Sequence, residues 1–253
     1  MRVYFYEDDI AKVEVSISRY NFALPFAEGK SVLDIGCGAR KGPLILSEKA
    51  KKIIATDISF QAIEYCKENY RKNNVSYIVS DAVRLPFREG FFDIVSSFEV
   101  IEHLNDYLEY LREAKRVLKE KGSFIVSTPN REVVSPGGNL TNPDHVREFD
   151  LEQFSRILGD FFQDFVVYGQ HASQRTKQLE KIRLDNLKTI DRMPKALRKL
   201  YPKGFKESTL RFCHYLSAIL CKGIDSKKIT QNDFFFTKED LKTARYFLAV
   251  CKK

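Results

Sequence analysis

Apolar and polar residues alternate in blocks along the first two thirds of the chain. Short apolar runs such as "SVLDI", "KIIAT" and "FDIVSS" are each followed by a longer stretch in which apolar residues recur every three or four positions. Continuous short runs predict strands that are buried on both faces, and the longer stretches predict amphipathic helices. This rhythm predicts a doubly wound α/β fold, in which helices cover both faces of a mostly parallel sheet.

Seven strands can be read from this pattern, and a long interruption separates the last two. We therefore expect a Rossmann-like, seven-stranded sheet domain formed by residues 1–169 and 232–253. Residues 170–231 lack strand signals and are rich in helix formers, which predicts a helical insertion before the last strand. The stretch 107–122 predicts an amphipathic helix closed by Gly122. The predicted strands are 31–38, 52–59, 75–82, 92–100, 123–130, 161–170 and 246–252.

Size and composition fit one intracellular domain. The chain has 253 residues, of which 43% are hydrophobic, enough to bury a core. Its five cysteines show no zinc-ligand spacing and make a poor disulfide framework, so we expect reduced, structural thiols. No apolar run approaches the roughly 18 residues of a membrane span, and no signal-peptide pattern opens the sequence. These features predict a soluble, cytoplasmic protein.

The net charge of +8 is concentrated in the predicted insertion. Residues 170–231 contain fifteen Lys and Arg against five Asp and Glu. Such a segment can attract an anionic partner, but a solvated helical surface has the same composition, and both interpretations stay open. No RNA-binding module accompanies the charge, which argues against a nucleic-acid partner. The sequence does not indicate an oligomeric state.

A glycine turn and three acids mark the ends of the first three predicted strands. In "LDIGCG", Gly36 and Gly38 allow backbone N–H groups to approach a ligand closely. Asp34 precedes this turn, Asp57 ends the second strand and Asp81 ends the third. An acid after the second strand suits a ribose diol, and one after the third suits an exocyclic amine. The arrangement predicts a nucleoside site; a nicotinamide fingerprint would need a third glycine, where the chain has lysine.

The series "VLDIGCG", "IIATDIS", "VSDAVRLPF", "FDIVSSFEVIEHL" and "LKEKGSFIVSTPN" resembles the motifs of class I S-adenosylmethionine-dependent methyltransferases. The resemblance implies S-adenosylmethionine as the cofactor. It places the methionine end at the glycine turn, the ribose at Asp57 and the adenine at Asp81. Arg40 stands where the family often has a further glycine, and Gly42 comes late. The cofactor-binding residues that it implies are Asp34, Gly36, Gly38, Asp57, Ile58, Asp81, Ala82 and Glu99.

The segment "FEVIEHL" has three interpretations. In the first, Glu99 packs against the cofactor while Glu102 and His103 only begin a helix. In the second, His103 is a general base, assisted by Glu102 and by His145 from "NPDHVREFD". In the third, Glu99, Glu102, His103 and His145 bind a divalent metal such as Mg²⁺, Mn²⁺ or Zn²⁺. The E-x-x-E-H pattern resembles that of ubiquinone-type catechol O-methyltransferases and small-RNA terminal 2′-O-methyltransferases, which implies the metal.

The last 25 residues, with "HVREF" and the basic insertion, resemble methyltransferases that occur with glycosyltransferases in glycan biosynthesis. This resemblance implies O-methylation of a sugar, glycan or other small-molecule hydroxyl, with the insertion as a lid over the acceptor. Metal-assisted methylation of RNA ribose or of a catechol is the alternative enzyme function, and a cofactor-binding regulator without catalysis is the alternative class. The apolar helix predicted within 208–224 could also contact a membrane surface.

Overall fold

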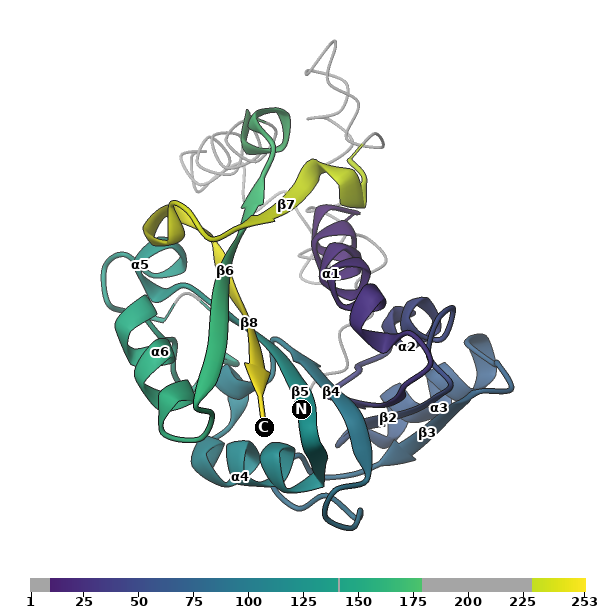
Figure 1. Ribbon diagram of the computed structural model, residues 1–253. Coiled ribbons are helices and arrows are strands. Elements are labelled where there is room, and N and C mark those ends of the chain that lie inside the picture. Colours follow the sequence, from purple (N-terminus) through teal and green to yellow (C-terminus); the bar gives the residue numbers. More distant parts are fainter. Residues whose placement is uncertain (1–9, 141, 179–228) are drawn as a thin grey trace, which may run out of the picture. The chain divides into compact units, whose positions relative to one another are not determined.

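One eight-stranded sheet organises the protein (Figure 1), which we describe from a computed structural model at residues 10–140, 142–178 and 229–253. The strand order is β3-β2-β1-β4-β5-β8-β6-β7. The pairs among β1 to β5 are parallel, whereas β8 runs antiparallel to both β5 and β6. The strands are β1 (Ser31–Ile35), β2 (Lys52–Asp57), β3 (Val75–Val79), β4 (Phe92–Phe98), β5 (Leu118–Pro129), β6 (Asp164–Ala172), β7 (Phe234–Thr237) and β8 (Tyr246–Lys252).

Helices cover the sheet on both faces, as Figure 1 shows. The α-helices are α1 (Ile10–Ala23), α2 (Gly42–Leu46), α3 (Phe60–Asn69), α4 (Tyr107–Val117), α5 (Arg131–Val134) and α6 (Leu151–Gly159). Short 3₁₀ helices are formed by Leu24–Ala27, Ile101–His103, Gln231–Asp233 and Leu241–Thr243. Successive strand side chains alternate between faces, so Leu33 packs in the core under α4 and α6, while Val32 packs in the core under α1, α2 and α3.

The doubly wound, mostly parallel fold is confirmed, but the number of strands was wrong. β7 was missed because a four-residue strand at the sheet edge carries little periodic signal beside the polar "KED" that follows. The helix predicted over 107–122 ends at Val117, and β5 starts at Leu118. Gly122 therefore lies within a strand, where a Cβ would come within 3.0 Å of the carbonyl oxygen of Asp93 on β4.

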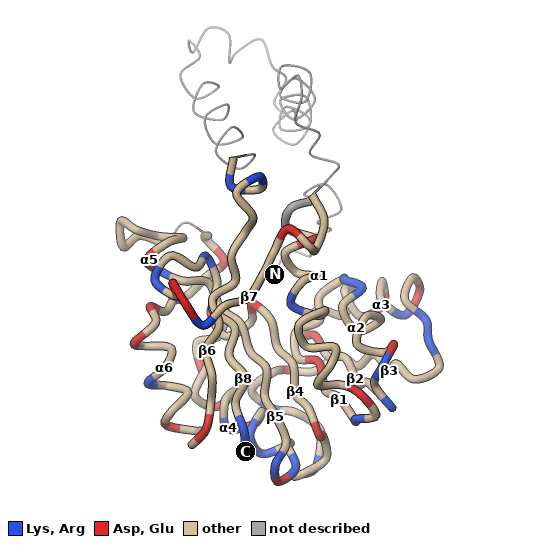
Figure 2. The backbone as a smooth tube through the Cα atoms, turned by 45° about the horizontal axis from the view of Figure 1, so that its top comes forward, with Lys and Arg blue, Asp and Glu red and all other residues tan. Residues whose placement is uncertain are grey.

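The chain folds into two compact units, Met1–His171 with Phe234–Lys253, and Ala172–Asp233. Most of the predicted insertion, including the apolar helix and the basic stretch, lies outside the described residues, so its proposed role as a lid stays a prediction. In the described part, both signs of charge are interspersed over the fold (Figure 2). No helix in that part is long and apolar enough to cross a membrane.

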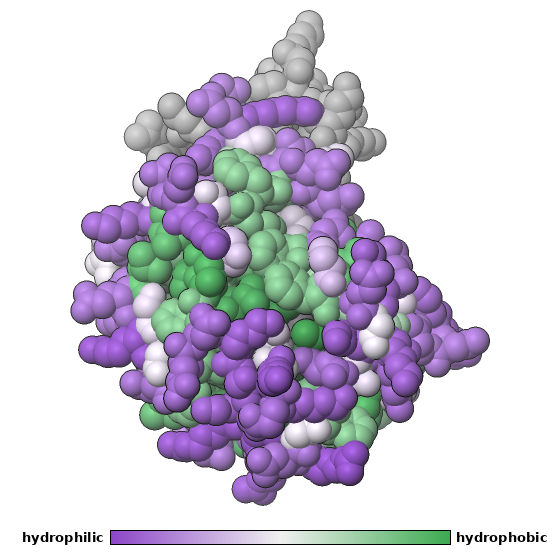
Figure 3. Space-filling view, viewed as in Figure 1, coloured by the Kyte–Doolittle hydropathy of each residue, from purple (hydrophilic) through white to green (hydrophobic). Residues whose placement is uncertain are grey.

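Partly buried aromatic residues lie on the face covered by α1. Phe22 of α1 contacts Phe26, Tyr168 of β6 and Phe236 of β7, with ring centroids 4.7–5.9 Å apart. Figure 3 shows apolar surface in the middle of this view. These contacts tie α1 to the antiparallel end of the sheet and so fix the helix that reaches the candidate site.

A buried carboxylate joins α1 to the centre of the sheet. Asp34 of β1 is fully buried and accepts hydrogen bonds from the Tyr20 hydroxyl of α1 at 3.0 Å and from the Ser96 hydroxyl of β4 at 2.6 Å. Burial raises the pKa of Asp34 to about 7, against the opposing effect of both hydrogen bonds. The folded state therefore holds a proton on Asp34 that the unfolded chain, with a carboxyl pKa of about 3.9, releases.

This network makes stability depend on pH. Between about pH 4 and 7 the folded state binds more protons at Asp34 than the unfolded state, so the free energy of unfolding falls as pH rises, by up to about 4 kcal/mol. We expect the free energy of unfolding of Asp34→Asn to decrease less steeply with pH than that of the wild type, measured by chemical denaturation from pH 4 to 8. Tyr20→Phe, which keeps the titrating carboxyl, should retain the slope. An unchanged slope in Asp34→Asn would contradict the assignment.

Candidate functional site

The turn after β1 brings backbone to the carboxyl ends of the strands. Gly36 has φ 72° and Gly38 has φ 57°, a left-handed conformation that favours glycine. A Cβ at Gly36 would lie 2.4 Å from Cγ2 of Val100, so this turn packs directly against the segment after β4. The N–H of Gly36 and that of Cys37 donate to the carbonyl of Thr56, which fixes the turn to β2. The turn is therefore held between β2 and the segment after β4, at the carboxyl ends of the parallel strands, where ligands bind in folds of this type.

Asp57 and Asp81 lie at the ends of neighbouring strands, as predicted. Asp57 accepts hydrogen bonds from the N–H of Gly38 and from that of Ser59, both at 2.8 Å. Each carboxylate oxygen keeps a further lone pair for a ribose hydroxyl. Asp81 is exposed and accepts from the N–H of Val83 at 3.1 Å. Ile58 is 56% exposed beside Asp57, so it offers apolar surface to a base.

The predicted cofactor residues differ in burial. Asp34 is fully buried and its carboxylate is taken up by Tyr20 and Ser96, so it supports the turn from below. Ala82, next to Asp81, is partly buried and packs on the core under α4. Neither Gly36 nor Gly38 offers a side chain, and their contribution is the shape of the backbone.

Glu99 pairs with an arginine that the sequence pattern did not single out. Glu99 has φ 58°, and its Oε1 accepts from the Ser127 hydroxyl at 2.7 Å. Its Oε2 lies 3.6 Å from Nη2 of Arg19, on α1. Arg19 is 2% exposed, yet this Nη2 makes no hydrogen bond within the described residues. In sequence, Arg19 is one charged residue among several in a helical stretch, and no spacing rule marks it.

Two contacts hold the Arg19 guanidinium in place. Its Nε donates to Oε1 of Gln170 at 2.8 Å, and its Cζ lies 4.3 Å from the centroid of the Tyr246 ring. Gln170 in turn donates to the Ser18 hydroxyl at 2.7 Å. The guanidinium is therefore fixed by β6, β8 and α1, with one nitrogen left for an anionic partner.

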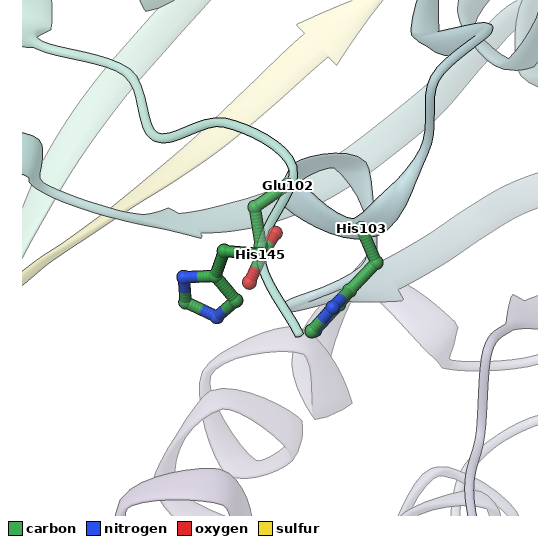
Figure 4. Close-up of side chains that lie close together, drawn as sticks. All are labelled: Glu102, His103 and His145. Atoms are coloured by element: carbon green, nitrogen blue, oxygen red, sulfur yellow. The ribbon is translucent and has the colours of Figure 1, made fainter. Parts of the chain in front are cut away.

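A second group of ionisable side chains gathers on the other side of Val100. Ligand atoms of Glu102, His103 and His145 all lie within 4.8 Å of one another (Figure 4). The His103 and His145 rings meet edge-on, with centroids 4.9 Å apart. Of the four predicted metal ligands these three come together, whereas Glu99 turns to Arg19 and Ser127. The cluster could take a proton from a substrate or hold a cation.

Burial sets the state of Glu102. This residue is completely buried, and its Oε1 has no hydrogen-bond partner among the described residues. Its Oε2 accepts a long hydrogen bond of 3.4 Å from the Thr128 hydroxyl. Desolvation, with repulsion from the Glu99 carboxylate, raises the pKa of Glu102 well above its usual range. Glu102 therefore favours either a proton or a cation as its neighbour.

Both imidazoles are held through Nδ1. Nδ1 of His103 lies 2.8 Å from the carbonyl oxygen of Asp144, which can only accept, so this nitrogen carries the hydrogen. Nδ1 of His145 lies 2.7 Å from Oε1 of Glu148. Among the described residues, Nε2 of neither ring has a hydrogen-bond partner. Nε2 of His103 can therefore accept, whereas the contact of His145 with a carboxyl group leaves the position of its hydrogen to the tautomer.

Backbone hydrogen bonds join the loop that carries His145 to the turn after β4. The N–H of Val146 donates to the carbonyl of Glu102 at 2.9 Å, and that of Arg147 donates to the same oxygen at 3.3 Å. Sequence separation hides this contact, because Val146 comes 44 positions after Glu102. Glu148 was missed although it lies only three positions after His145, because its burial and its contact with the imidazole arise only in the folded loop.

Comparisons with known proteins agree with this geometry. Residues 33–126 match a family model described as a methyltransferase domain. A "probable S-adenosylmethionine-dependent methyltransferase" of Mycobacterium tuberculosis is 32% identical over 163 residues, which are 64% of this chain and 59% of that relative. The malonyl-[acyl-carrier protein] O-methyltransferase of Marinomonas is 31% identical over 143 residues, 54% of this chain and 53% of the relative. The matches thus span little more than half of these curated relatives.

Solved structures share the fold. YcgJ of Bacillus subtilis has a TM-score of 0.58 at 19% identity, covering 93% of this chain and 97% of that one. A SAM-dependent methyltransferase of Archaeoglobus fulgidus has a TM-score of 0.58 at 20% identity, covering 95% and 94%. The glycine turn, the strand-end acids, the sheet order and these matches together support a class I S-adenosylmethionine-dependent methyltransferase domain, with the family match over residues 33–126.

Proposed function

We propose that the protein transfers a methyl group from S-adenosylmethionine to a hydroxyl of a sugar, a glycan or another small molecule. One observation carries the proposal. Within five residues after β4, Glu99 precedes Val100, which packs on Gly36, while Glu102 and His103 join His145 in one cluster. This arrangement supports a methyl-donor site and a proton acceptor at the two ends of one short segment.

The residues fit the cofactor. The turn at Gly36 and Gly38 has no side chain to obstruct a ligand, Asp57 retains acceptor lone pairs for ribose hydroxyls, and Ile58 offers an apolar contact for adenine. When bound, S-adenosylmethionine would supply an electrophilic methyl group on a sulfonium. Asp81 would accept from the adenine amine, and the chain's task is otherwise to align donor and acceptor.

Arg19 and Glu99 would bind the methionine end together. An α-amino acid carries a carboxylate and an ammonium on neighbouring atoms, and Arg19 and Glu99 offer the complementary charges 3.6 Å apart. Val100, which follows Glu99, packs on Gly36, and Tyr20, which follows Arg19, bonds Asp34 below the same turn. These contacts of the neighbouring residues support our assignment of the pair to the methionine end, which the sequence motif puts at this turn.

Proton removal would fall to an imidazole of the cluster. A hydroxyl that attacks the methyl group must lose its proton, and histidine suits this transfer near neutral pH. Nε2 of His103, whose Nδ1 donates to a carbonyl, or Nε2 of His145 in the tautomer with its hydrogen on Nδ1, would take the proton. The resemblance of the chain's tail to glycan-associated methyltransferases supports a sugar hydroxyl as acceptor. A catalytically silent regulator would not need this pair of imidazoles.

A metal-assisted methyltransferase on RNA ribose or a catechol is the second candidate. Two observations on Glu102 favour it. The buried Oε1 of Glu102 has no hydrogen-bond partner among the described residues. Its carboxyl group also has an oxygen within 4.8 Å of ligand atoms of both His103 and His145. Two imidazoles and one carboxylate suit Zn²⁺ or Mn²⁺ better than Mg²⁺, which prefers oxygen ligands. Glu102, His103 and His145 would hold the ion, which would polarise the acceptor oxygen.

The proposed function predicts methyl transfer that depends on the cluster. Purified protein with labelled S-adenosylmethionine should methylate at least one member of a panel of glycans, catechols and RNA, measured by label transfer. His103→Asn combined with His145→Gln should lower kcat by roughly 10²- to 10⁴-fold and leave cofactor affinity within about twofold. Cofactor binding without transfer to any acceptor would favour the regulator.

The methionine end can be tested with a pair of ligands. S-adenosylhomocysteine carries the amino acid group, whereas 5′-methylthioadenosine lacks it. We expect Arg19→Gln and Glu99→Gln each to weaken binding of S-adenosylhomocysteine by roughly 10- to 100-fold, and to leave that of methylthioadenosine unchanged, by calorimetry. Arg147→Gln is the matched control, because Arg147 also stacks on a tyrosine, at 4.2 Å from the Tyr107 ring centroid. Equal losses for both ligands would refute the assignment.

Metal removal separates the two candidate mechanisms. If the cluster holds an ion, excess EDTA should abolish methyl transfer while calorimetry still detects S-adenosylhomocysteine binding. Co²⁺ added to the stripped protein should give visible absorption bands, and Glu102→Gln should remove them. Full turnover in EDTA, with no Co²⁺ spectrum, would exclude the metal-assisted mechanism.

A further inference from the structure

Glu148 forms a buried pair with His145. Its Oε1 lies 2.7 Å from Nδ1 of His145, and its side chain is completely buried while that of His145 is 10% exposed. Its other oxygen, Oε2, has no hydrogen-bond partner among the described residues. The imidazole is thus the single side chain that engages this carboxyl group in the described structure.

The fold fixes Glu148 on both sides. Before it, the N–H of Val146 is bonded to the carbonyl of Glu102. After it, Phe149 forms a bridge with Asn130, and its carbonyl accepts from the N–H of Arg131 at 2.9 Å. The next residue, Asp150, starts α6 with a capping box. Glu148 therefore has little freedom to turn away from His145.

The two histidines differ in what supports them. His103 is exposed and donates to a backbone carbonyl, which carries only a partial charge. His145 is largely buried and faces a carboxyl group, which as a carboxylate both selects the Nδ1–H tautomer and stabilises an imidazolium. A base that becomes positively charged in a buried place needs such a counter-charge.

We propose that Glu148 is a positioning residue that holds His145 with its hydrogen on Nδ1, so that Nε2 of His145, and not that of His103, takes the proton of the acceptor. This inference rests on the proposed methyl transfer. In the step, the acceptor oxygen forms a bond to the methyl carbon as the sulfur–methyl bond breaks and its electron pair stays on sulfur. The hydroxyl proton passes to Nε2, and the resulting imidazolium later releases it to water.

Nitrogen-15 NMR of the imidazoles tests the tautomer without any acceptor substrate. The chain has four histidines, and His145→Gln assigns the signal. We expect the hydrogen on Nδ1 in the wild type and in Glu148→Gln, whose amide oxygen can still accept. In Glu148→Met, which cannot accept, it should shift toward Nε2. A wild-type hydrogen on Nε2 overturns the inference, and S-adenosylhomocysteine binding reports that each variant is folded.

Kinetics then test the role. Glu148→Gln, which keeps the tautomer but loses the charge, should lower kcat by roughly 10-fold, and Glu148→Met by roughly 100-fold or more, with little change in KM. Adding His145→Gln to Glu148→Met should cause no further loss, because the two residues act as a unit. Losses that multiply, or a larger loss in His103→Asn than in His145→Gln, overturn it. If no acceptor is methylated, the proposed function fails while the NMR result still decides the tautomer.

Discussion

The close approach of Gly36 to Val100 is the contact on which the site depends. Because Gly36 has no Cβ, the turn after β1 can lie against the segment after β4, where any side chain would meet Cγ2 of Val100 at 2.4 Å. Glu99 precedes Val100 and the turn Ile101–His103 follows it. One packing contact therefore joins the glycine turn to the segment that carries both Glu99 and two members of the histidine cluster, the segment on which the proposed function rests.

Buried acids give this segment its chemistry. Asp34 lies under the turn, where two hydroxyl donors hold it and burial raises its pKa. Glu102 and Glu148 are buried beside His103 and His145, and each has one oxygen with no hydrogen-bond partner in the described structure. Burying a carboxyl group without a partner lowers the stability of the folded state, and a ligand, proton or cation that supplies the partner restores it. These destabilising groups gather at the proposed site, as expected where residues are kept for function.

Sequence predicted the elements whose signals are local. Short apolar runs, and the glycine and polar residues that end them, predicted the parallel strands, the glycine turn and the strand-end acids Asp57 and Asp81. The structure has these features at the expected positions. The β7 strand and the end of α4 were misjudged, since a four-residue edge strand and a helix that runs directly into a strand give weak periodicity. The sequence also did not predict that Glu99 and Glu102 have different partners. Glu99 adopts a left-handed backbone conformation, which a sequence pattern does not indicate.

By itself, the sequence determined the alternating α/β architecture and the glycine turn after β1, because strand and helix periods and glycine conformations are properties of neighbouring residues. Only the tertiary structure decided which ionisable groups work together. Arg19 reaches Glu99 across 80 positions and His103 meets His145 across 42, through packing of α1 and of the 142–150 loop. Such partnerships depend on three-dimensional contacts and on burial, which shifts the pKa of a carboxyl only once the surrounding core has formed.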